Sequence, residues 1–414
     1  MNATSDSYWP PYTALTGQDQ RPVIQRGEGV YLYDKQGRRY FDAISGCYNH
    51  CLGHSHPEFI AALQQQLSTL VHACNIYSNT QLPGEMAEKL VSRLSKSGLR
   101  KTFIVGSGSE GVESALKMAW QYQVNASHPA RTRIVAIDGA YHGCTLGAMM
   151  ATRRPFINDG ILPSLLASNT ITMPAPEHSE DIKSWETLLE EQESTIAAVI
   201  IEPVMAMEGT RQLPEGFLQQ LSRLTKRHDI PLICDEVYCG IGRTGSFCES
   251  ISQGVYPDII IFSKCLGGGV PVTAVLATET IADSFRGQPF PFFRHGHTQS
   301  GNLLGCRAGM FVLDYLDNHH LYDDVMTKGK QFLALARQQF PETEGLISLQ
   351  GKGLMLSITF ASPAFSSRAQ SAIRQQGVIV GTAGPHLKLA PAFTISAQEI
   401  EELTRRMATA LRNL

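Results

Sequence analysis

Residues 102–111 read TFIVGSGSEG, in which a short apolar run leads directly into a glycine-rich turn and the start of a helical pattern. Small residues at such a turn let the backbone approach an anion, and the first turn of a helix favours a phosphate group. The turn matches the GxGxxG spacing of dinucleotide-binding units, and Asp138 ends the next apolar run, as such a unit requires. The stretch therefore predicts a strand, a turn and a helix, with a dinucleotide, another phosphate or no ligand at the turn.

Apolar runs of the same kind follow along the chain, with helical patterns between several of them. They are continuous and β-branched rather than alternating, which is typical of strands covered on both faces in a largely parallel sheet. The predicted fold class is therefore α/β, with a large domain in which helices flank a mostly parallel central sheet. The runs lie at 133–137, 197–201, 232–234, 259–262 and 273–277, and the helical patterns at 57–71, 83–94, 110–122 and 215–227, the first two beginning at Pro57 and Pro83.

The two ends of the chain lack this alternation of strands and helices. The segment up to about Tyr12 is aromatic and proline-rich and is expected to lie as an arm over another surface. Tyr31–Asp42 predicts two strands around a turn, and the chain after about Asn302 predicts one long helix, a small α+β region that includes 354–358, and a last helix from about Ala397. The expected domains are 1–56 (arm and part of a small domain), 57–301 (large cofactor-binding domain) and 302–414 (linking helix and the rest of the small α+β domain).

Composition and charge narrow the class of protein. The 414 residues include 35 lysines and arginines and 38 aspartates and glutamates, a net charge of -3 that offers no basic field to nucleic acid or to an anionic membrane. Hydrophobic residues make up 43% and charged residues 18%, as in a globular protein with a large core. No apolar run reaches the length of a membrane span, no secretory signal is readable, and nine cysteines without CxxC spacing suit a reducing compartment. We expect a cytoplasmic protein that binds neither nucleic acid nor membranes.

Two side chains able to carry chemistry follow separate apolar runs. Asp235 comes directly after the run at 232–234, and Lys264 follows the run at 259–262. Because the carboxyl ends of parallel strands line one crevice, this carboxylate and this amine are expected on the same edge as the glycine turn. A phosphate site, a strand-end aspartate and a buried lysine together fit pyridoxal phosphate. The lysine would form the Schiff base, and the aspartate would keep the pyridinium nitrogen protonated.

Short motifs of this kind recur along nearly the whole chain, from Trp9 to Pro391. They are LGHSHP at 52–57, GSGSE at 106–110, YHG at 141–143, IEPV at 201–204, DEV at 235–237, GRTG at 242–245, SK at 263–264, HTQSGN at 297–302 and GKGLM at 351–355. Each is weak alone, but in this order and at these separations the sequence resembles the class III, ω-type aminotransferases of the fold-type I pyridoxal-phosphate enzymes.

The resemblance implies roles for individual residues. Lys264 and Asp235 are the expected catalytic residues: Lys264 as Schiff-base nucleophile and proton carrier, Asp235 as the partner of the ring nitrogen. Thr298 is expected to bind the phosphate across a subunit boundary, which implies a homodimer with shared active sites. The expected cofactor-binding residues are Ser107, Gly108, Ser109, Tyr141 (stacked on the ring), His142, Asp235, Val237, Lys264 and Thr298.

Other reactive side chains are interpreted as structural. His50, His54 and His56, with two nearby cysteines, could suggest a metal cluster, but the LGHSHP turn accounts for two of them and no metal site is predicted. Cys265, beside the lysine, is interpreted as a small apolar residue of the core. Glu202 is expected to fix the end of a strand rather than to transfer protons.

Several positions depart from the pattern of relatives that use 2-oxoglutarate. Many of those relatives carry an arginine directly after the YHG motif, where this sequence has Cys144. They also pair a glutamate with a carboxylate-binding arginine. These two positions correspond to Met207 and Lys388, with Glu208 one residue out of register. A lysine keeps the positive charge but loses the planar fork that binds a carboxylate with two hydrogen bonds.

The predicted function is that of a pyridoxal-phosphate-dependent aminotransferase with a ping-pong mechanism. It would move an amino group from a primary amine or amino acid, at the ω position, to a keto acid or aldehyde, with pyruvate favoured over 2-oxoglutarate. Lys388 and Arg153 are the predicted substrate-binding residues, and Arg154 is near enough in sequence to serve as well. Three alternatives stay open: a decarboxylating transaminase of the dialkylglycine decarboxylase type, a non-catalytic binding protein with this fold, and a dehydrogenase.

Overall fold

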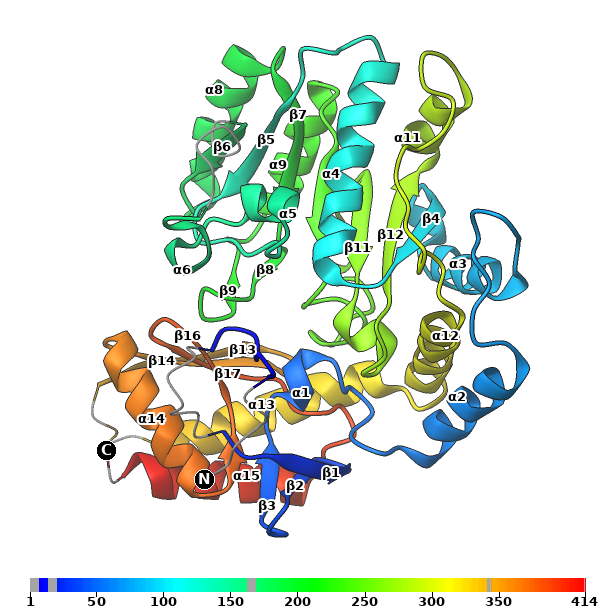
Figure 1. The fold of residues 1–414 in the computed structure, drawn as a ribbon. Helices are drawn as coiled ribbons and strands as arrows, with labels where there is room; N and C mark the ends of the chain where they lie inside the picture. The colour runs from blue at the N-terminus through cyan, green and yellow to red at the C-terminus, as the bar shows by residue number, and fades with distance from the viewer. Residues whose placement is uncertain (1–6, 14–20, 162–168, 341–342, 344, 413) are drawn as a thin grey trace.

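The computed structural model describes residues 7–13, 21–161, 169–340, 343, 345–412 and 414. Its central feature is a seven-stranded sheet with the strand order β4-β12-β11-β10-β7-β5-β6 (Figure 1). β12 runs antiparallel to both of its neighbours, and the other adjacent pairs are parallel, so the predicted mostly parallel sheet is confirmed. The strands are β4 (Leu99–Val105), β5 (Arg133–Ile137), β6 (Thr170–Met173), β7 (Ile196–Ile201), β10 (Leu232–Asp235), β11 (Ile259–Phe262) and β12 (Thr273–Thr278).

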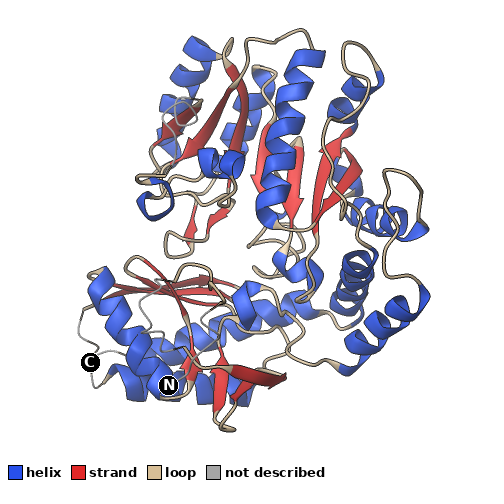
Figure 2. Cartoon of the chain, in the orientation of Figure 1, coloured by secondary structure: helices blue, strands red, loops and turns tan. Residues whose placement is uncertain are grey.

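Apolar side chains cover both faces of this sheet. Along β7, Ala198 and Ile200 belong to one buried cluster with helix α4 (Gly108–Asn125). Val199 and Ile201 belong to a second cluster, which includes residues of α9 (Phe217–Arg227). Successive side chains of a strand point to opposite faces, so a sheet covered twice requires the continuous apolar runs of the sequence. Figure 2 shows helices on both sides of these strands.

Both ends of the chain build the smaller α+β domain. Strand β15 (Val378–Ile379), from the C-terminal part, pairs in parallel with β3 (Arg39–Asp42), in a sheet with the order β1-β2-β3-β15. A second sheet has the order β13-β14-β17-β16. The division of the chain at residues 56 and 301 stays a prediction. The other elements of this region are β1 (Ile24–Glu28), β2 (Tyr31–Asp34), β13 (Leu346–Lys352), β14 (Met355–Phe360), β16 (Gly381–Ala383), β17 (His386–Leu389), α13 (Leu321–Gln339), α14 (Pro363–Gln375) and α15 (Ala397–Leu411).

Two helices differ from the predicted pattern. The single long helix expected after Asn302 is two helices, α12 (Leu303–Asn318) and α13, separated at His320, whose φ of 51° is left-handed. No glycine or proline marks this break, so the helical pattern of the sequence continues through it. Pro83 is the third residue of α3 (Gln81–Arg93) rather than its first. This position loses no hydrogen bond, because the N–H groups of a first helical turn have no intrahelical acceptor.

The remaining elements are mostly short. Across the described ranges, every helix falls short of the length and apolar character that a bilayer span demands. A two-stranded hairpin of β8 and β9 extends from the large sheet towards the small domain (Figure 1). The bounds are α1 (Ser45–Tyr48), α2 (Pro57–Thr69), α5 (Leu146–Ala151), α6 (Pro155–Asn158), α8 (Ile182–Gln192), α10 (Glu249–Ser252), α11 (Glu279–Asp283), β8 (Val204–Met205) and β9 (Arg211–Gln212).

Candidate active site

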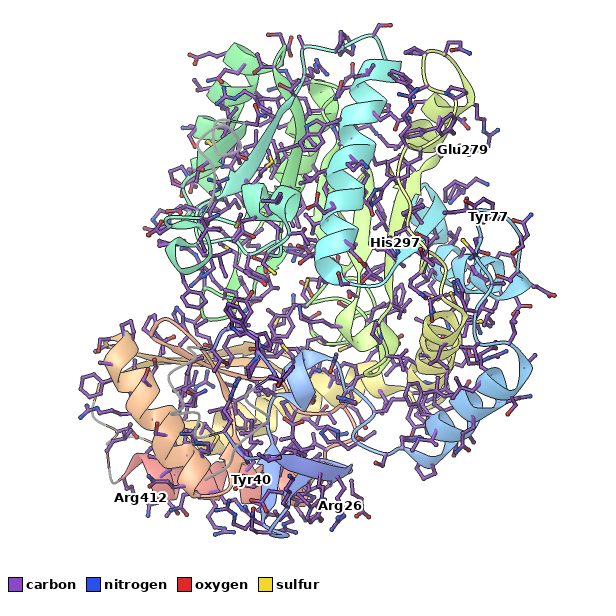
Figure 3. The ribbon with its side chains drawn as sticks, viewed as in Figure 1. Arg26, Tyr40, Tyr77, Glu279, His297 and Arg412 are labelled. Atoms are coloured by element: carbon purple, nitrogen blue, oxygen red, sulfur yellow. The ribbon has the colours of Figure 1, made fainter. Side chains whose placement is uncertain are left out.

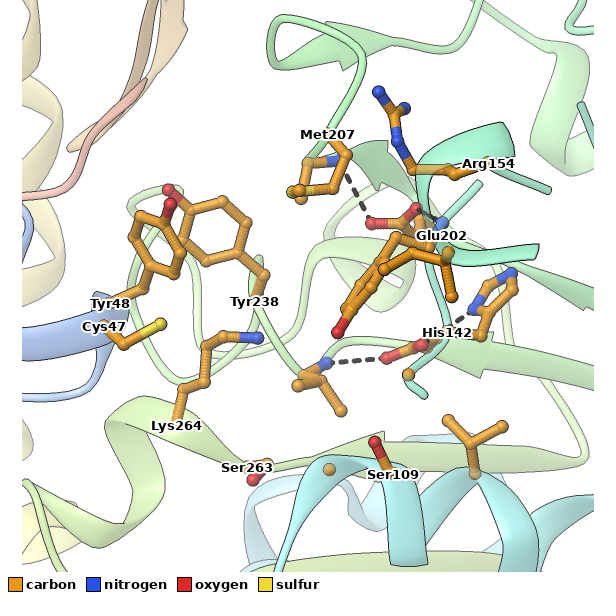
Figure 4. A pocket seen from close by; sticks show the side chains of 18 of the residues that line it. Cys47, Tyr48, Ser109, His142, Arg154, Glu202, Met207, Tyr238, Ser263 and Lys264 are labelled. Carbon is orange, nitrogen blue, oxygen red and sulfur yellow. Dashed lines mark hydrogen bonds and ion pairs between the residues drawn. The ribbon is translucent and has the colours of Figure 1, made fainter. Parts of the chain in front are cut away.

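A cavity of about 580 Å³ lies between the large sheet and the small domain. This volume is within the range of small-molecule sites, roughly 300–1,000 Å³. The large domain contributes residues at strand ends, and the small domain contributes residues of α1, β16 and β17 (Figure 4). Of the predicted site residues, Ser107, Gly108, Ser109, Tyr141, His142, Asp235, Val237, Lys264 and Lys388 line this cavity.

The glycine turn presents the N-terminus of α4 to the cavity. Ser107 caps this helix by accepting a hydrogen bond from the Glu110 N–H, and the Glu110 carboxylate accepts the N–H groups of Gly106 and Ser107, each at 2.8 Å. The N–H groups of Gly108 and Ser109 follow in the first turn, where no intrahelical acceptor exists. A Cβ on Gly108 would lie 2.9 Å from Cγ1 of Val237, so glycine is required for this close approach. The turn is therefore built to offer backbone donors to an anion.

Asp235 stands at the end of β10 with both carboxylate oxygens engaged. Oδ1 accepts the Val237 N–H at 3.0 Å, and Oδ2 lies 2.8 Å from Nδ1 of His142. Because an ionised carboxylate can only accept, Nδ1 of His142 carries the hydrogen. The other ring nitrogen of His142 is buried and has no partner among the described residues. This contact fixes the carboxylate in the cavity wall, where Asp235 is 4% exposed.

Glu202 is a second buried carboxylate in the same wall. It accepts the N–H groups of Tyr141 at 2.9 Å and Ala206 at 3.0 Å. Burial raises the pKa of Glu202 above its ordinary value. The hydrogen bond from Tyr141 ties the end of β7 to the loop of Tyr141, and the one from Ala206 holds the segment that follows β7, which agrees with the expected role in fixing a strand end.

Lys264 follows β11 and lies at the cavity in a strained conformation. Its φ is 41°, in the left-handed region that side chains other than glycine rarely adopt. The side chain extends into the cavity, and Nζ lies 5.4 Å from the centroid of the Tyr238 ring (Figure 4). Left-handed residues cost of order 1–3 kcal/mol and cluster at functional sites, where the surrounding structure maintains them. The chain therefore maintains a strained lysine at this cavity.

Lys388 occupies a closed recess of the cavity. It lies on β17, is 1% exposed, and has its Nζ 2.9 Å from the thioether sulfur of Met207. Nζ also lies 4.5 Å from the ring centroid of Tyr48 and 4.9 Å from that of Tyr238. Burial, and then the charge of Lys264, lowers the pKa of Lys388 to about 7. The structure thus brings Lys388 and Met207 together, the two positions that the sequence comparison with 2-oxoglutarate users singled out.

Two predicted site residues lie elsewhere. The guanidinium of Arg153 bonds to the Met150 carbonyl, and Arg153 is not among the residues that line the cavity. The neighbouring Arg154 does line it. Thr298 is exposed and also lies outside the lining of the cavity.

Several residues that line the cavity belong to no recognisable sequence motif. Tyr12 reaches it from the N-terminal arm, and its ring centroid lies 5.9 Å from that of Phe156 on α6. Tyr48 packs against Tyr238 with ring centroids 4.5 Å apart and ring planes tilted by 49°. The aromatic character of the arm was the available signal for Tyr12. The other contacts arise where α1, α6 and the sheet meet in space, which sequence spacing does not reveal.

The arrangement of these groups suits one small ligand. A helix N-terminus for an anion, a carboxylate for a cationic nitrogen, an aromatic ring at Tyr141 and an amine at Lys264 all line one cavity. These groups match the phosphate, the pyridinium nitrogen, the flat ring and the aldehyde of pyridoxal phosphate. The residues present therefore fit this cofactor.

Comparisons with known proteins agree with this fit. The family model for class-III aminotransferases matches residues 14–411. The chain is similar to the acetylornithine aminotransferase of Mesorhizobium japonicum, with 34% identity over 398 residues that cover 95% of this chain and 94% of the relative. It is also similar to the adenosylmethionine-8-amino-7-oxononanoate aminotransferase of Aquifex aeolicus, with 32% identity over 370 residues that cover 85% and 81%. Two relatives with nearly equal sequence identity to this chain are thus named for different amino-group substrates.

Among solved structures, the chain is similar to an amine transaminase from an uncultivated Pseudomonas species in its pyridoxal-phosphate-bound form. The TM-score is 0.93, the sequence identity is 28%, and the match covers 100% of both chains. The similarity therefore extends over the large sheet and the small domain together.

Proposed function

This chain belongs to the class-III aminotransferases, a family of pyridoxal-phosphate enzymes with fold type I, and we propose that it transfers ω-amino groups. The donor would be a primary amine or an amino acid that reacts at a carbon remote from its α-carboxylate. The acceptor would be a keto acid or an aldehyde, and the two half-reactions would alternate on one site. The observation that carries the proposal is the joint presence of Lys264, Asp235 and the α4 N-terminus in one cavity. A cytoplasmic location is part of the proposal and is supported by nine free thiols.

The cofactor is proposed to bind along the edge of the large sheet. The N–H groups of Gly108 and Ser109 would hold the phosphate, and Asp235 would hold the ring nitrogen in its protonated form. Bound there, pyridoxal phosphate supplies an aldehyde for the substrate nitrogen and a ring that withdraws electrons from the reacting carbon. Ser107 would fix the turn, Tyr141 and Val237 would cover the ring, and His142 would orient Asp235.

Lys264 is proposed to be the residue that links covalently to the cofactor and moves the proton. The strained backbone of Lys264 and its position at the cavity support this role, because the Nζ atom must be held where it can reach the cofactor. The Nζ of Lys264 would accept the proton from the substrate carbon and deliver it to the carbon that was the aldehyde of the cofactor, the shift that amino-group transfer requires. Glu202 is tied by two backbone hydrogen bonds and is not needed for this step.

Lys388 is proposed to bind the carboxylate of a keto-acid acceptor. A buried ammonium is stable when it is paired, and here its polar contact in the described structure is a thioether. A substrate carboxylate beside Lys388 would supply the missing negative charge. The proposal predicts pyruvate as a better acceptor than 2-oxoglutarate, since position 144 is a cysteine and Lys388 offers one charge to one carboxylate.

The acceptor half-reaction tests this role of Lys388. Lys388→Met should lower kcat/KM for pyruvate about 10- to 100-fold, the worth of a hydrogen bond to a charged group, and should change a neutral aldehyde much less. In the wild type, kcat/KM for pyruvate should fall as the pH rises through about 7, because Lys388 loses its charge there. The measurement is kcat/KM for pyruvate, 2-oxoglutarate and the aldehyde across pH in both proteins. Equal losses with charged and neutral acceptors would mean that Lys388 has a structural role.

A stability measurement serves as a control for this variant. The pKa of Lys388 is about 7 in the folded chain and 10.5 ordinarily, so the unfolded chain binds more protons between these values. Wild-type stability should therefore decrease, relative to Lys388→Met, as the pH falls from about 10 to about 7. A difference in Tm that does not change with pH would mean that Lys388 is not buried as described.

We further propose that the enzyme is a homodimer whose partner completes each site. Thr298, which the family resemblance assigns to the phosphate, is exposed and lies away from the cavity of its own chain. Tyr77 lies on the same flank as His297, the neighbour of Thr298 (Figure 3), and Asn75 bonds to the carbonyl of Ser300 at 3.0 Å. Ile76 and Tyr77 are 62% and 88% exposed. Exposed apolar side chains next to a loop of this kind favour a protein interface.

Mixed dimers test the shared site. Lys264→Ala and Thr298→Glu chains should each be nearly inactive alone. A refolded mixture should recover up to about a quarter of wild-type activity, because half of the dimers then contain one site with both residues intact. A mixture of Lys264→Ala and Asp235→Ala chains is the matched control and should recover nothing, since both lesions lie in the chain's own cavity. A Thr298→Glu mixture no more active than its components would contradict the proposal.

The overall proposal is tested by a panel of donors and acceptors. Addition of a ω-amino acid or a primary amine should change the absorbance of the bound cofactor, and pyruvate should reverse the change. Release of carbon dioxide from a dialkylglycine would favour a decarboxylating transaminase instead. No spectral response to any donor would favour a binding protein that retained this fold.

A further inference from the structure

Arg154 lines the active-site cavity but is already paired. Its guanidinium forms an ion pair with Glu208 and donates to the Gly139 carbonyl at 3.0 Å. The side chain is 14% exposed, and the backbone N–H of Arg154 bonds to Asn158 Oδ1 at 2.9 Å. The arginine is therefore fixed at the cavity wall with its charge compensated.

The surrounding chain is built to hold Glu208 in this place. A Cβ on Gly139 would lie 2.9 Å from Cγ of Glu208 and 3.1 Å from its Oε1, and Gly139 has a φ of 79°. Glycine at this position thus leaves room for the carboxylate while its own carbonyl accepts from Arg154. Glu208 follows Met207, the residue in contact with Lys388, so the ion pair and the lysine recess share one loop.

The charges in this part of the cavity favour substrates with one carboxylate. Lys388 and Arg154 each bring a positive charge, and Glu208 cancels that of Arg154. A diacid has two carboxylates, of which the second would have to displace Glu208 or stay unpaired beside it. Glu202 adds no positive charge for a second carboxylate, and its own carboxylate is held by backbone N–H groups.

We infer that the Arg154–Glu208 pair sets the acceptor class: Glu208 occupies Arg154 and thereby excludes diacids such as 2-oxoglutarate in favour of mono-acids. This inference rests on the proposed aminotransferase function and names the specificity of that site. Glu208 is a positioning residue, which acts on the substrate through Arg154.

Substitution of Glu208 tests the inference. Glu208→Gln should raise the ratio of kcat/KM for 2-oxoglutarate to that for pyruvate about 10- to 100-fold, because it frees the guanidinium for a second carboxylate. The double variant Glu208→Gln with Arg154→Gln should lose this gain. Glu186→Gln is the matched control: it breaks an exposed pair with Arg227 (2.7 Å) on the surface and should leave the ratio unchanged. An unchanged ratio in Glu208→Gln, or a gain that persists in the double variant, would overturn the inference.

A binding measurement separates this inference from the proposed function. Calorimetric titration of the holoenzyme with glutarate and with butyrate compares a diacid and a mono-acid of similar size without any turnover. Glu208→Gln should tighten glutarate binding about 10-fold or more and leave butyrate unchanged. Equal changes in the affinity for both acids would contradict the inference, even if the enzyme is active. An enzyme that transfers no amino group but shows the glutarate shift would instead refute the proposed function alone.

Discussion

Replacement of Lys264 by alanine should reduce amino-group transfer roughly 10⁴-fold or more while pyridoxal phosphate still binds. Under the proposed function, the variant would lose the covalent link and the group that moves the proton, and proton transfer by a positioned side chain alone contributes about 10²–10⁴-fold. The N–H groups of Gly108 and Ser109, which are the proposed phosphate donors, and the carboxylate of Asp235 are unchanged. The measurement is kcat with the best amine donor and pyruvate, together with the cofactor content of the purified variant.

Chemical trapping provides the control for Lys264. Borohydride treatment of the coloured wild-type protein should fix the cofactor on the peptide that contains Ser263, Lys264 and Cys265, as mass spectrometry would show. Lys388 is the other lysine that lines the cavity, so its peptide is the internal comparison. Cofactor fixed on Lys388, or an unmodified Lys264 peptide from reduced protein, would contradict the assignment.

Replacement of Asp235 by asparagine should lower kcat about 10²–10⁴-fold with little loss of bound cofactor. Removal of one partner of a buried charge pair costs about 3–5 kcal/mol, and the pair here would form between Asp235 and the ring nitrogen. Asparagine retains an oxygen for the Val237 N–H, so the local fold should persist. Asp235→Ala removes that acceptor too and should be at least as severe. Single-turnover kinetics with an amine donor would measure the effect on the chemical step.

Asp258 offers a matched comparison for Asp235. Its Oδ2 accepts the Leu232 N–H at 2.9 Å, at the opposite end of β10 from Asp235. Asp258→Asn should lower stability without a large effect on kcat. A comparable loss of kcat in both variants would mean that Asp235 acts through the sheet and not on the cofactor.

The large domain could be predicted because its strands are buried on both faces. Runs such as 133–137 and 259–262 coincide with β5 and β11, since a continuous β-branched run has few other stable environments. β6 at Thr170–Met173 and β16 at Gly381–Ala383 are short and carry polar residues, so they leave no comparable pattern. The break at His320 cannot be predicted from the sequence because its left-handed conformation has no glycine to indicate it.

Residues of the candidate site could be predicted only where a reactive side chain directly follows the end of a strand. The sequence predicts that Asp235 and Lys264 share a site because the carboxyl ends of parallel strands lie at one edge of the sheet. The ion pair of Arg154 with Glu208 joins residues 54 positions apart, and the recess of Lys388 needs Tyr48 from the other end of the chain. Arg153 and Arg154 are equivalent in the sequence, and the local turn before α6 decides which of them reaches the cavity.

The most direct test of the proposed amino-group transfer is to run the two half-reactions separately. The holoenzyme with an amine donor alone should release carbonyl product in an amount equal to its active sites and then stop. After removal of the donor, pyruvate alone should yield the same amount of alanine and restore the original absorbance. Product that forms only when donor and acceptor are present together, or carbon dioxide in place of a transferred amino group, would contradict the account.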